Sequence, residues 1–334
     1  MTQTVLVTGG SGFIAGWCIA QLLDQGYAVR ATVRSDDKAD IVRQTVGRTG
    51  ADLSRLSFAI ADLTQDAGWD EATQGCDYVL HVASPLGRDT QDLEALVRPA
   101  RDGTIRVLKA AKGANVKRVV VTSSCGAATP RDTTGAVDVD ETTWTDPNDP
   151  NLDSYRRSKA VAERAAWDWM AENDDPARMT TVLPAAVFGP ILSREAMSSV
   201  ALIEGLLNGR PPMTPRVGFN VVDVRDVAEL HIRAMTMPDA AGQRLIAAGE
   251  RMWMGDVAAI LRRRLGERAA KVPKRNMPDW LVRLMARFVP LMKPLVPMIG
   301  RQISFSSAKA QAMTGWRPRP GAATIVECAE SLLP

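Results

Sequence analysis

Tyr155 and Lys159 stand four residues apart in the stretch SYRRSKAVAERAAW, which covers residues 154–167. If this stretch is helical, both side chains lie on one face, about one turn apart. An ammonium group beside a tyrosine stabilises the phenolate and lowers a phenol pKa that is otherwise about 10, so the pair could transfer a proton near neutral pH. The same spacing also occurs on ordinary solvated helices. The rest of the chain must decide between these two interpretations.

The elements that would position this pair alternate between short apolar strands and helices over the first 190 or so residues. Such alternation is typical of βαβ units and of a parallel sheet that is covered by helices on both faces. Strands are expected at TVLVT (4–8), AVRATV (28–33), LSFAIA (56–61), DYVLHVA (77–83), RVVVTSS (118–124) and TTVLPAAVFG (180–189).

The segment VTGGSGFIAGW follows the first strand and opens a helix, with Gly9, Gly12 and Ala15 at a Gly-x-x-Gly-x-x-Gly/Ala spacing. The turn needs backbone torsions that side chains disfavour, and a pyrophosphate must approach bare amides at the helix N-terminus. A small third residue lets the helix pack against the strand. This strand–turn–helix context predicts a dinucleotide site rather than a merely tight turn. The expected cofactor contacts are Thr8, Gly9, Ser11, Gly12, Phe13 and Ile14.

The end of the second strand distinguishes NAD from NADP, because NAD-binding sites place a carboxylate there for the ribose 2′-hydroxyl. In ATVRSDDK the strand ends in Arg34. The forked donors of a guanidinium match a 2′-phosphate, and Lys38 could assist, so the sequence predicts NADP(H); the alternative is a solvated surface arginine. Asp62 and Leu63 follow the third strand and are expected near the adenine. Asp62 could accept a hydrogen bond from the adenine amino group or cap the next helix.

After residue 189 the alternation is lost, and prolines separate short helices. FNVVDVRDVAELHIRAM (219–235) reads as a strand followed by a helix, and QRLIAAG (243–249) reads as a strand. We therefore predict an α/β fold: a Rossmann-type doubly wound parallel sheet with a smaller, mostly helical C-terminal substrate lobe. The NADP-binding Rossmann domain is assigned to residues 1–189, with 217–249 returning to the sheet, and the substrate-binding lobe to 190–216 and 250–334.

Seven segments in order resemble the extended branch of the short-chain dehydrogenase/reductase superfamily, also described as the NAD-dependent epimerase/dehydratase superfamily. Within it, the chain is most similar to dihydroflavonol reductases, cinnamoyl-CoA reductases and microbial aldehyde/ketone reductases. The resemblance covers most of the chain to about residue 248, and SSAKAQAMTGWRPR extends it. Residues 271–304 have no clear match, so plant substrates are not carried over. The seven segments are VTGGSGFIAGW, ATVRS, LHVASP, VVVTSSCGA, YRRSKAVAERAAW, LPAAVFGP and VVDVRDVAELHI.

The resemblance implies that Ser124, Tyr155 and Lys159 form the catalytic set. We favour Ser124 over Ser123 because neighbouring strand residues point to opposite sides and the family uses the later serine. Ser124 would orient the substrate oxygen, Tyr155 would protonate the developing alkoxide, and Lys159 would lower the tyrosine pKa and hold the nicotinamide ribose. The remaining cofactor contacts implied by the resemblance are Val82, Ala83, Ser84, Thr122, Pro184 and Val187, besides Tyr155 and Lys159 themselves.

Other matched positions carry no chemistry of their own. His81 lies inside the fourth strand and is expected to be a buried structural residue rather than a catalytic one. Asp223 and Asp226 are expected in a network at a strand end and a helix start. No metal ligands are expected, because Cys18, Cys76, Cys125 and Cys328 are scattered and form no Cys-x-x-Cys pair. Their scatter is typical of reduced thiols in a reducing compartment.

The implied activity is that of an NADP-dependent oxidoreductase acting on CH–OH donors, here a reductase of small apolar aldehydes or ketones. Alternatives are a nucleotide-sugar epimerase or dehydratase, a 3-hydroxysteroid-type dehydrogenase, and a non-catalytic NADP sensor. Arg34 disfavours the tightly bound NAD of the epimerases, and the complete catalytic set disfavours the sensor. The basic residues Arg301, Arg317 and Arg319 are compatible with a diphosphate substrate, so the epimerase alternative is retained. A pliant apolar pocket, or alternatively plain core, is indicated by Met197, Met213, Met252, Trp253, Met277, Trp280 and Met285.

Composition excludes other classes of function. The 334 residues are 46% hydrophobic and 24% charged, which is ordinary for a globular protein. The 41 basic and 38 acidic residues are interspersed, so no nucleic-acid partner is expected. The segment WLVRLMARFVPLMKPLVPMIG is interrupted by three basic residues and three prolines, so we expect short amphipathic helices and no membrane span. No signal peptide is expected, the location is expected to be cytoplasmic, and the chain should be a monomer or homodimer.

Overall fold

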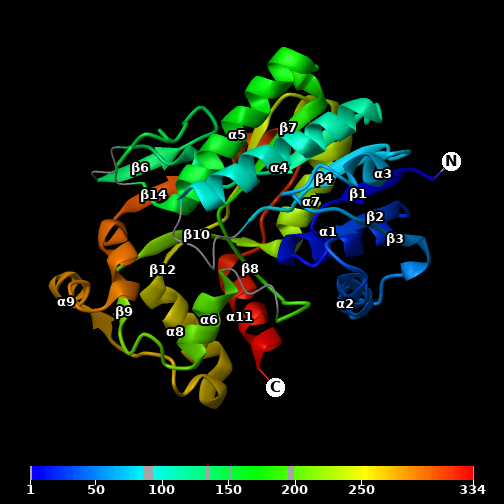
Figure 1. Ribbon diagram of the computed structural model, residues 1–334. Coiled ribbons are helices and arrows are strands. Elements are labelled where there is room, and N and C mark those ends of the chain that lie inside the picture. Colours follow the sequence, from blue (N-terminus) through cyan, green and yellow to red (C-terminus); the bar gives the residue numbers. More distant parts are fainter. Residues whose placement is uncertain (1, 86–92, 132–134, 151, 195–198, 334) are drawn as a thin grey trace.

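A seven-stranded parallel sheet, in the order β11-β7-β5-β4-β1-β2-β3, crosses the molecule (Figure 1). The computed structural model describes residues 2–85, 93–131, 135–150, 152–194 and 199–333. Strands that are covered on both faces are continuous apolar runs, as the sequence predicts. The strands are β1 (Thr4–Val7), β2 (Ala28–Val33), β3 (Leu56–Ile60), β4 (Tyr78–His81), β5 (Arg118–Thr122), β7 (Met179–Pro184) and β11 (Arg244–Ala247).

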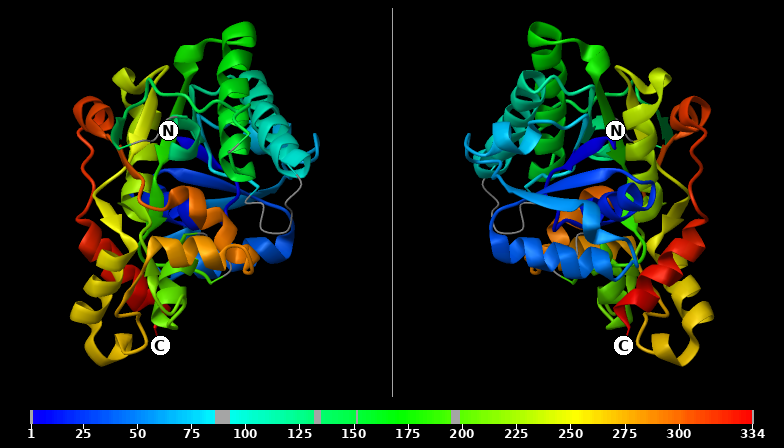
Figure 2. Two further views of the ribbon diagram at one scale, coloured as in Figure 1. Left: turned by 90° about the vertical axis from the view of Figure 1, so that its left-hand side faces the viewer. Right: turned by 90° about the vertical axis from the view of Figure 1, so that its right-hand side faces the viewer.

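Helices cover both faces of this sheet (Figure 2). Successive strand residues point to opposite faces, so Val5 and Val7 enter the core beneath α1 and α7, whereas Leu6 enters the core beneath α4 and α5. This arrangement confirms the predicted Rossmann-type fold. One layer holds α1 (Phe13–Asp24), α2 (Asp36–Gly47), α7 (Val224–Thr236) and α10 (Ala308–Thr314), and the other holds α3 (Trp69–Thr73), α4 (Leu93–Gly113) and α5 (Ser154–Asn173).

The C-terminal part forms a second, smaller region below the sheet in Figure 1, with its own apolar cores. Its helices are α6 (Val200–Leu207), α8 (Met254–Leu265), α9 (Asp279–Met285), the 3₁₀ segment η6 (Pro290–Met298) and α11 (Gly321–Leu332). Its strands are β8 (Ala186–Phe188), β9 (Thr214–Pro215), β10 (Gly218–Asp223), β12 (Arg251–Trp253), β13 (Asn276–Met277) and β14 (Gln302–Phe305), the last of which pairs with β6 (Ala136–Val139). Short 3₁₀ turns are η1 (Leu53–Arg55), η2 (Cys125–Ala128), η3 (Pro176–Arg178), η4 (Pro238–Ala240) and η5 (Gly266–Ala269).

The segment predicted to return to the sheet, residues 217–249, divides between the two regions. Within it, β11 pairs with β7 at the edge of the large sheet, and α7 packs against α1. In contrast, β10 pairs with β8 and β12 in a separate three-stranded sheet, because β8 has already left the large sheet after Pro184. The pairing of β14 with β6 also gives the smaller region a strand from the first half of the chain.

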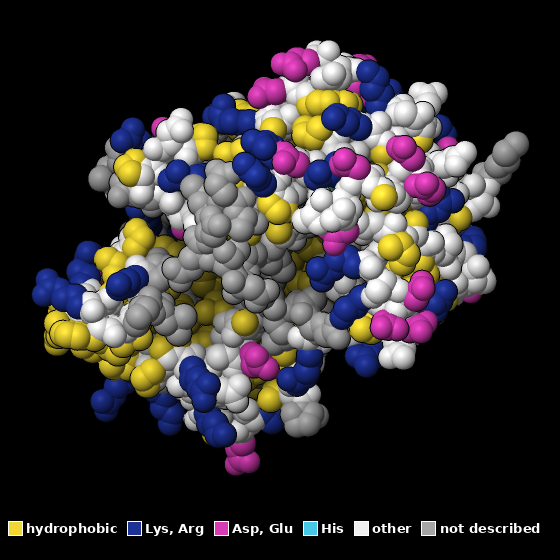
Figure 3. Space-filling model, viewed as in Figure 1, with side chains coloured by type: hydrophobic (Ala, Val, Ile, Leu, Met, Phe, Trp, Pro, Cys, Tyr) yellow, Lys and Arg dark blue, Asp and Glu magenta, His cyan; other side chains and the backbone are white. Residues whose placement is uncertain are grey.

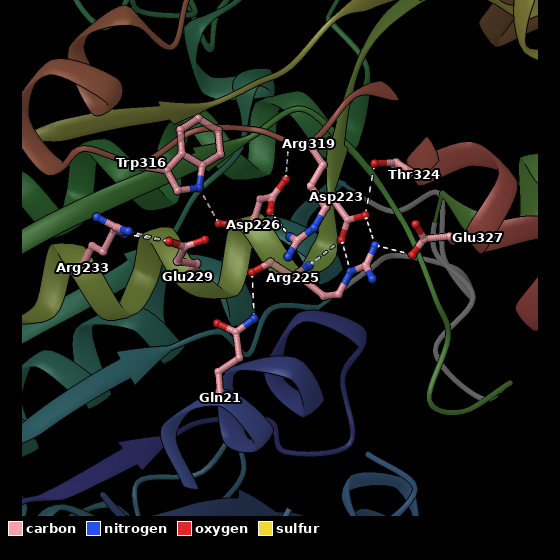
Figure 4. Close-up of polar contacts among 10 residues, drawn as sticks. All are labelled: Gln21, Asp223, Arg225, Asp226, Glu229, Arg233, Trp316, Arg319, Thr324 and Glu327. Atoms are coloured by element: carbon pink, nitrogen blue, oxygen red, sulfur yellow. Dashed lines mark hydrogen bonds and ion pairs between the residues drawn. The ribbon is translucent and has the colours of Figure 1, made fainter. Parts of the chain in front are cut away.

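A polar network fastens the start of α7 to the C-terminal segment (Figure 4). Asp223, which is fully buried, caps α7 by accepting a hydrogen bond from the Arg225 backbone at 2.9 Å and pairs with the Arg225 guanidinium at 2.7 Å. Arg225 also pairs with Glu327 of α11 at 2.7 Å, and Asp226 pairs with Arg319. The network predicted for these two aspartates is thereby confirmed, and its effect is to hold the smaller region against the nucleotide-binding half.

Candidate active site

A cavity of about 780 Å³ runs along the carboxyl ends of the strands of the large sheet. In doubly wound sheets this edge forms a crevice where the strand order reverses, here between β1 and β4. The cavity brings together residues that the sequence analysis selected from separate motifs. It is lined by Gly9, Ser11, Gly12, Phe13, Ile14, Arg34, Lys38, Asp62, Leu63, Val82, Ala83, Ser84, Thr122, Ser124, Tyr155, Lys159, Pro184 and Val187, among others.

Thr8 differs from the other expected cofactor contacts, because it is fully buried and does not line the cavity. Its Oγ1 lies 2.9 Å from Nδ1 of His81 and accepts a hydrogen bond from the backbone N–H of Ala83 at 3.0 Å. Thr8 therefore supports the turns after β1 and β4 from behind. Burial lowers the pKa of His81 to about 3, and its Nε2 lies 3.3 Å from Thr104 Oγ1, which confirms the structural role expected for this histidine.

The turn after β1 and the start of α1 line one end of the cavity. Gly9 has a φ of +68°, and a Cβ at this position would lie 2.9 Å from Cβ of Ala83, so a larger residue would clash. Gly12 begins α1 without a side-chain cap, and the first turn of α1 has no acidic residue. Ala15 is fully buried in the core between α1 and the sheet. The uncapped N–H groups and the positive end of the helix dipole suit an anionic group.

At the opposite end of the cavity, charged side chains follow β2 and β3. Arg34 is exposed directly after β2, and Lys38 lies in the first turns of α2. Asp62 Oδ1 accepts hydrogen bonds from the Thr64 amide at 2.8 Å and the Thr64 hydroxyl at 2.7 Å, and these bonds, with the nearby Arg34 charge, lower the pKa of Asp62. Asp62 therefore closes the turn after β3 and is not the cap of α3, which begins after Gly68. Its contact with adenine stays a prediction.

Three elements bring the predicted catalytic set together. Asp153 caps α5 by accepting a hydrogen bond from the Arg156 amide at 2.9 Å, so Tyr155 lies in the first turn and Lys159 one turn later. The Tyr155 hydroxyl donates to Ser124 Oγ, after β5, at 3.4 Å. Lys159 Nζ donates to Ser84 Oγ, after β4, at 3.0 Å and lies 6.0 Å from the centre of the Tyr155 ring. The three side chains thus meet at one wall of the cavity.

The two neighbouring serines point in different directions, as strand alternation requires. Ser123 Oγ donates to Glu163 Oε2 at 2.7 Å, behind the site. Ser124 Oγ faces Tyr155 and accepts a second hydrogen bond from the Gly126 amide at 3.0 Å, which fixes its position at the start of η2. Ser124, and not Ser123, is therefore the serine whose hydroxyl lies next to Tyr155.

Burial shifts the pKa values of both Lys159 and Tyr155. Burial lowers the pKa of Lys159 to about 8, and Glu163 acts in the opposite direction. Desolvation raises the pKa of Tyr155, while the hydrogen bond to Ser124 acts to lower it. Lys159 Nζ donates to Ser84 rather than to the phenol, so its expected stabilisation of the Tyr155 phenolate stays a prediction.

A buried ion pair behind the site was missed in the sequence. Glu163, one turn after Lys159 on α5, pairs with Arg244 of β11 at 2.8 Å and accepts from the Thr181 hydroxyl at 2.8 Å. Only 1% of the Glu163 side chain and 7% of the Arg244 side chain are exposed. The Arg244 guanidinium also stacks on Trp144 at 3.6 Å. In the sequence, only the four-residue spacing from Lys159 pointed to Glu163, and its partner Arg244 lies 81 residues further along the chain.

Several lining residues carried no recognisable sequence signal. Thr32 Oγ1 accepts the backbone N–H of Gly9 at 2.9 Å, and Ser199 reaches the cavity from just before α6 and donates to the Val187 carbonyl at 2.6 Å. The other lining residues without such a signal are Val33, Ala61, Thr64, Trp69, Pro85, Leu96, Pro99 and Ala185, and the lining also includes Ser123, which was set aside in favour of Ser124.

The Met- and Trp-rich residues expected to form an apolar substrate pocket do not line the cavity where the structure describes them. Met252 and Met277 are buried in the cores of the smaller region, as the alternative interpretation held, and Trp280 is 65% exposed. Met197 lies outside the described residues.

Arg301, Arg317 and Arg319, which were considered as partners of a diphosphate substrate, also lie outside the cavity lining. Arg319 pairs with Asp226, and Arg317 donates to the backbone carbonyls of Gln311 and Trp316.

Comparison with known proteins identifies the family. A sequence model of the NAD-dependent epimerase/dehydratase family matches residues 5–249. The chain belongs to this family. It is 37% identical over 340 residues to cinnamoyl-CoA reductase CAD2 of Medicago truncatula, covering 99% of this chain and 95% of that protein. It is 33% identical over 300 residues to the ketoreductase azaE of Aspergillus niger, covering 84% of this chain and 87% of that protein.

Among solved structures, the yeast methylglyoxal/isovaleraldehyde reductase Gre2 complexed with NADPH superposes with a TM-score of 0.82. The two chains are 26% identical, and the match covers 99% of this chain and 98% of that one. The predicted resemblance to the cinnamoyl-CoA reductase and aldehyde/ketone reductase group is confirmed, and the chain is an oxidoreductase of this family.

Proposed function

We propose that the chain is an NADPH-dependent carbonyl reductase that converts a small, apolar aldehyde or ketone to an alcohol. The observation that supports this most is the meeting of the Tyr155 hydroxyl, the Ser124 hydroxyl and the buried Lys159 ammonium at one wall of a cavity that also contains an uncapped helix N-terminus. The likeness to cinnamoyl-CoA reductase and to Gre2, which was crystallised with NADPH, supports the same class of reaction.

The residues present fit this cofactor. The first turn of α1 has no side-chain cap and no acidic residue, so its N–H groups can contact a pyrophosphate, and Arg34 can pair with a 2′-phosphate. Lys159 and Ser84 would hold the nicotinamide ribose. When bound, NADPH supplies the hydride.

The proton would come from the protein. Ser124 and Tyr155 would both donate hydrogen bonds to the substrate carbonyl oxygen and polarise it. As negative charge develops on that oxygen, Tyr155 would transfer its proton and leave an alcohol. The raised pKa of Tyr155 keeps the phenol protonated before this step, and the Lys159 ammonium would stabilise the phenolate after it.

A direct assay tests the proposal. We expect NADPH consumption in the presence of a panel of small apolar aldehydes and ketones. Inertness toward the whole panel, with turnover of a UDP- or dTDP-sugar, would assign the chain to the epimerases instead. Tight NADPH binding without turnover of any carbonyl compound or nucleotide sugar would indicate a non-catalytic cofactor-binding protein.

Cofactor preference is expected to depend on Arg34. The variant Arg34→Asp should shift the ratio of kcat/KM for NADPH to that for NADH by about tenfold to a hundredfold toward NADH, because a charge-assisted hydrogen-bonding partner is replaced by a repelling carboxylate. Arg263→Asp makes the same charge change at an exposed position of α8 outside the cavity lining and should leave the ratio unchanged. An unaltered ratio in Arg34→Asp would show that Arg34 does not read the phosphate.

An alkaline limit on activity is expected from Lys159. A lysine is charged below its pKa and neutral above it, so kcat/KM for NADPH should fall as the pH rises through about 8. Lys159→Arg keeps a cation at this pH, because the arginine pKa is about 12 or higher, so its profile should not fall in the same window, even if its rate is lower. A variant profile that falls at the same pH as wild type would assign the limit to another group.

A further inference from the structure

Exposed apolar side chains gather on α9 and the residues just after it. Trp280 is 65% exposed, Leu284 43%, Phe288 79% and Val289 36%. We refer to these four residues as the α9 patch. Among the described residues, only Ile60 and Tyr155 are other large hydrophobic side chains with comparable exposure, and Tyr155 belongs to the active site. Exposed apolar residues that cluster, rather than scatter singly, mark interaction surfaces.

The opposite side of the same segment is anchored in the protein. Val282 is fully buried and Ala286 is 7% exposed, and both belong to a small core with Met277, Met292 and Ile299. Residues four apart lie on one helical face, so Trp280 and Leu284 point away from this core together. The α9 patch is therefore the outward face of a packed element.

The surroundings of the patch are basic. Asp279 is the only acidic residue between positions 268 and 301, and it pairs with Arg216 at 2.6 Å. In Figure 3 the apolar surface at the left edge, in the region where Figure 1 labels α9, is bordered by dark-blue side chains. The exposed basic residues of positions 274–293, here called the basic rim, are Lys274, Arg275, Arg283, Arg287 and Lys293.

We propose that the α9 patch and its basic rim dock on the surface of an anionic phospholipid bilayer. Tryptophan, phenylalanine and leucine partition into the headgroup–acyl boundary, while lysine and arginine attract anionic lipids, and this segment joins both kinds of residue on one face. The docking is peripheral: none of the helices in the described parts of the chain is long and apolar enough to cross a bilayer. A symmetric contact with a second copy is disfavoured, because it would bring two basic rims together.

Vesicle binding tests this proposal with the full chain. We expect the protein to co-sediment with phosphatidylcholine vesicles that contain phosphatidylglycerol, and much less with pure phosphatidylcholine. The double variant Trp280→Ser/Phe288→Ser should lower the partition coefficient by about tenfold or more, because two apolar side chains lose their burial in lipid. Arg283→Gln/Arg287→Gln should lower it mainly at low ionic strength, where charges are least screened.

Matched controls separate this surface from general effects. Ile60→Ser removes an apolar side chain elsewhere that is 49% exposed, and Lys109→Gln/Lys112→Gln removes two exposed charges from α4. Both variants should bind vesicles as wild type does. The thermal midpoint of unfolding and the affinity for NADPH in solution should be unchanged in every variant. These two measurements show that each variant is folded and that vesicle binding is independent of the proposed reaction. Three results would overturn the proposal: no binding of wild type to phosphatidylglycerol vesicles, equal binding by the Trp280/Phe288 variant, or self-association through the patch without vesicle binding.

Discussion

Replacing Tyr155 with phenylalanine is expected to lower kcat for carbonyl reduction by about two to four orders of magnitude, the usual contribution of a positioned general acid. The substitution removes only the hydroxyl that donates to Ser124 at 3.4 Å. The ring remains at the cavity wall, so the dissociation constant for NADPH should be nearly unchanged. Steady-state rates and NADPH fluorescence titration measure the two quantities separately.

Tyr78→Phe is the matched control for this variant. Tyr78 lies on β4 and does not line the cavity, so loss of its hydroxyl should leave kcat close to that of wild type. If Tyr155→Phe were as active as Tyr78→Phe, Tyr155 would be excluded as the proton donor. If Tyr155→Phe lost NADPH affinity and kcat together, the hydroxyl would be acting in binding.

Glu163→Gln is expected to destabilise the protein by about 3–5 kcal/mol, because it leaves the Arg244 guanidinium buried without its counter-charge. The two groups are 2.8 Å apart and almost fully shielded from water, so the pair is not weakened by solvent as a surface pair would be. Arg244 would keep its hydrogen bonds to the Glu141 and Thr143 carbonyls, which do not neutralise it. Denaturant unfolding of wild type and variant measures the difference.

The same variant should also shift the pH profile. Glu163 raises the pKa of Lys159, so without its charge the alkaline fall in kcat/KM should move to lower pH. Glu172→Gln makes the same substitution at an exposed position of α5 and should change stability by less than about 0.5 kcal/mol, with no shift of the profile. A Glu163→Gln profile and unfolding curve that both match Glu172→Gln would show that the buried pair neither stabilises the fold nor tunes Lys159.

Local features of the chain were enough to predict most of the nucleotide-binding half. The strand β1, the Gly9 turn and α1 are contiguous, so their spacing reports their geometry directly. Strand alternation predicted that Ser123 and Ser124 point to opposite sides, as they do, because side-chain direction in a strand depends only on neighbouring residues. The choice of Ser124 came from the family resemblance. Thr8 was expected to contact the cofactor, yet its side chain is buried and points to His81.

Features of the site that could not be predicted from the sequence depend on interactions between distant segments. The Glu163–Arg244 pair joins α5 to β11, and the sheet edge that brings them together is formed only when β7 and β11 pair. The pKa of Tyr155 depends on how deeply the folded chain desolvates the phenol, and the position of the Lys159 ammonium depends on Ser84, which follows a different strand. Neither quantity is encoded in the four-residue spacing of the two side chains.

Short stretches of sequence were enough to predict the doubly wound sheet and the turn after β1, because the alternation of strands and helices and the glycine spacing are local features. The catalytic set of Ser124, Tyr155 and Lys159 rests on the family resemblance and stays a prediction. The folded chain was needed to show that β10 leaves the large sheet, that Met252 and Met277 are core rather than pocket, and that Trp280 faces outward. Those outcomes depend on which surfaces of the smaller region become buried against one another, and burial is a property of the packed molecule rather than of any one segment.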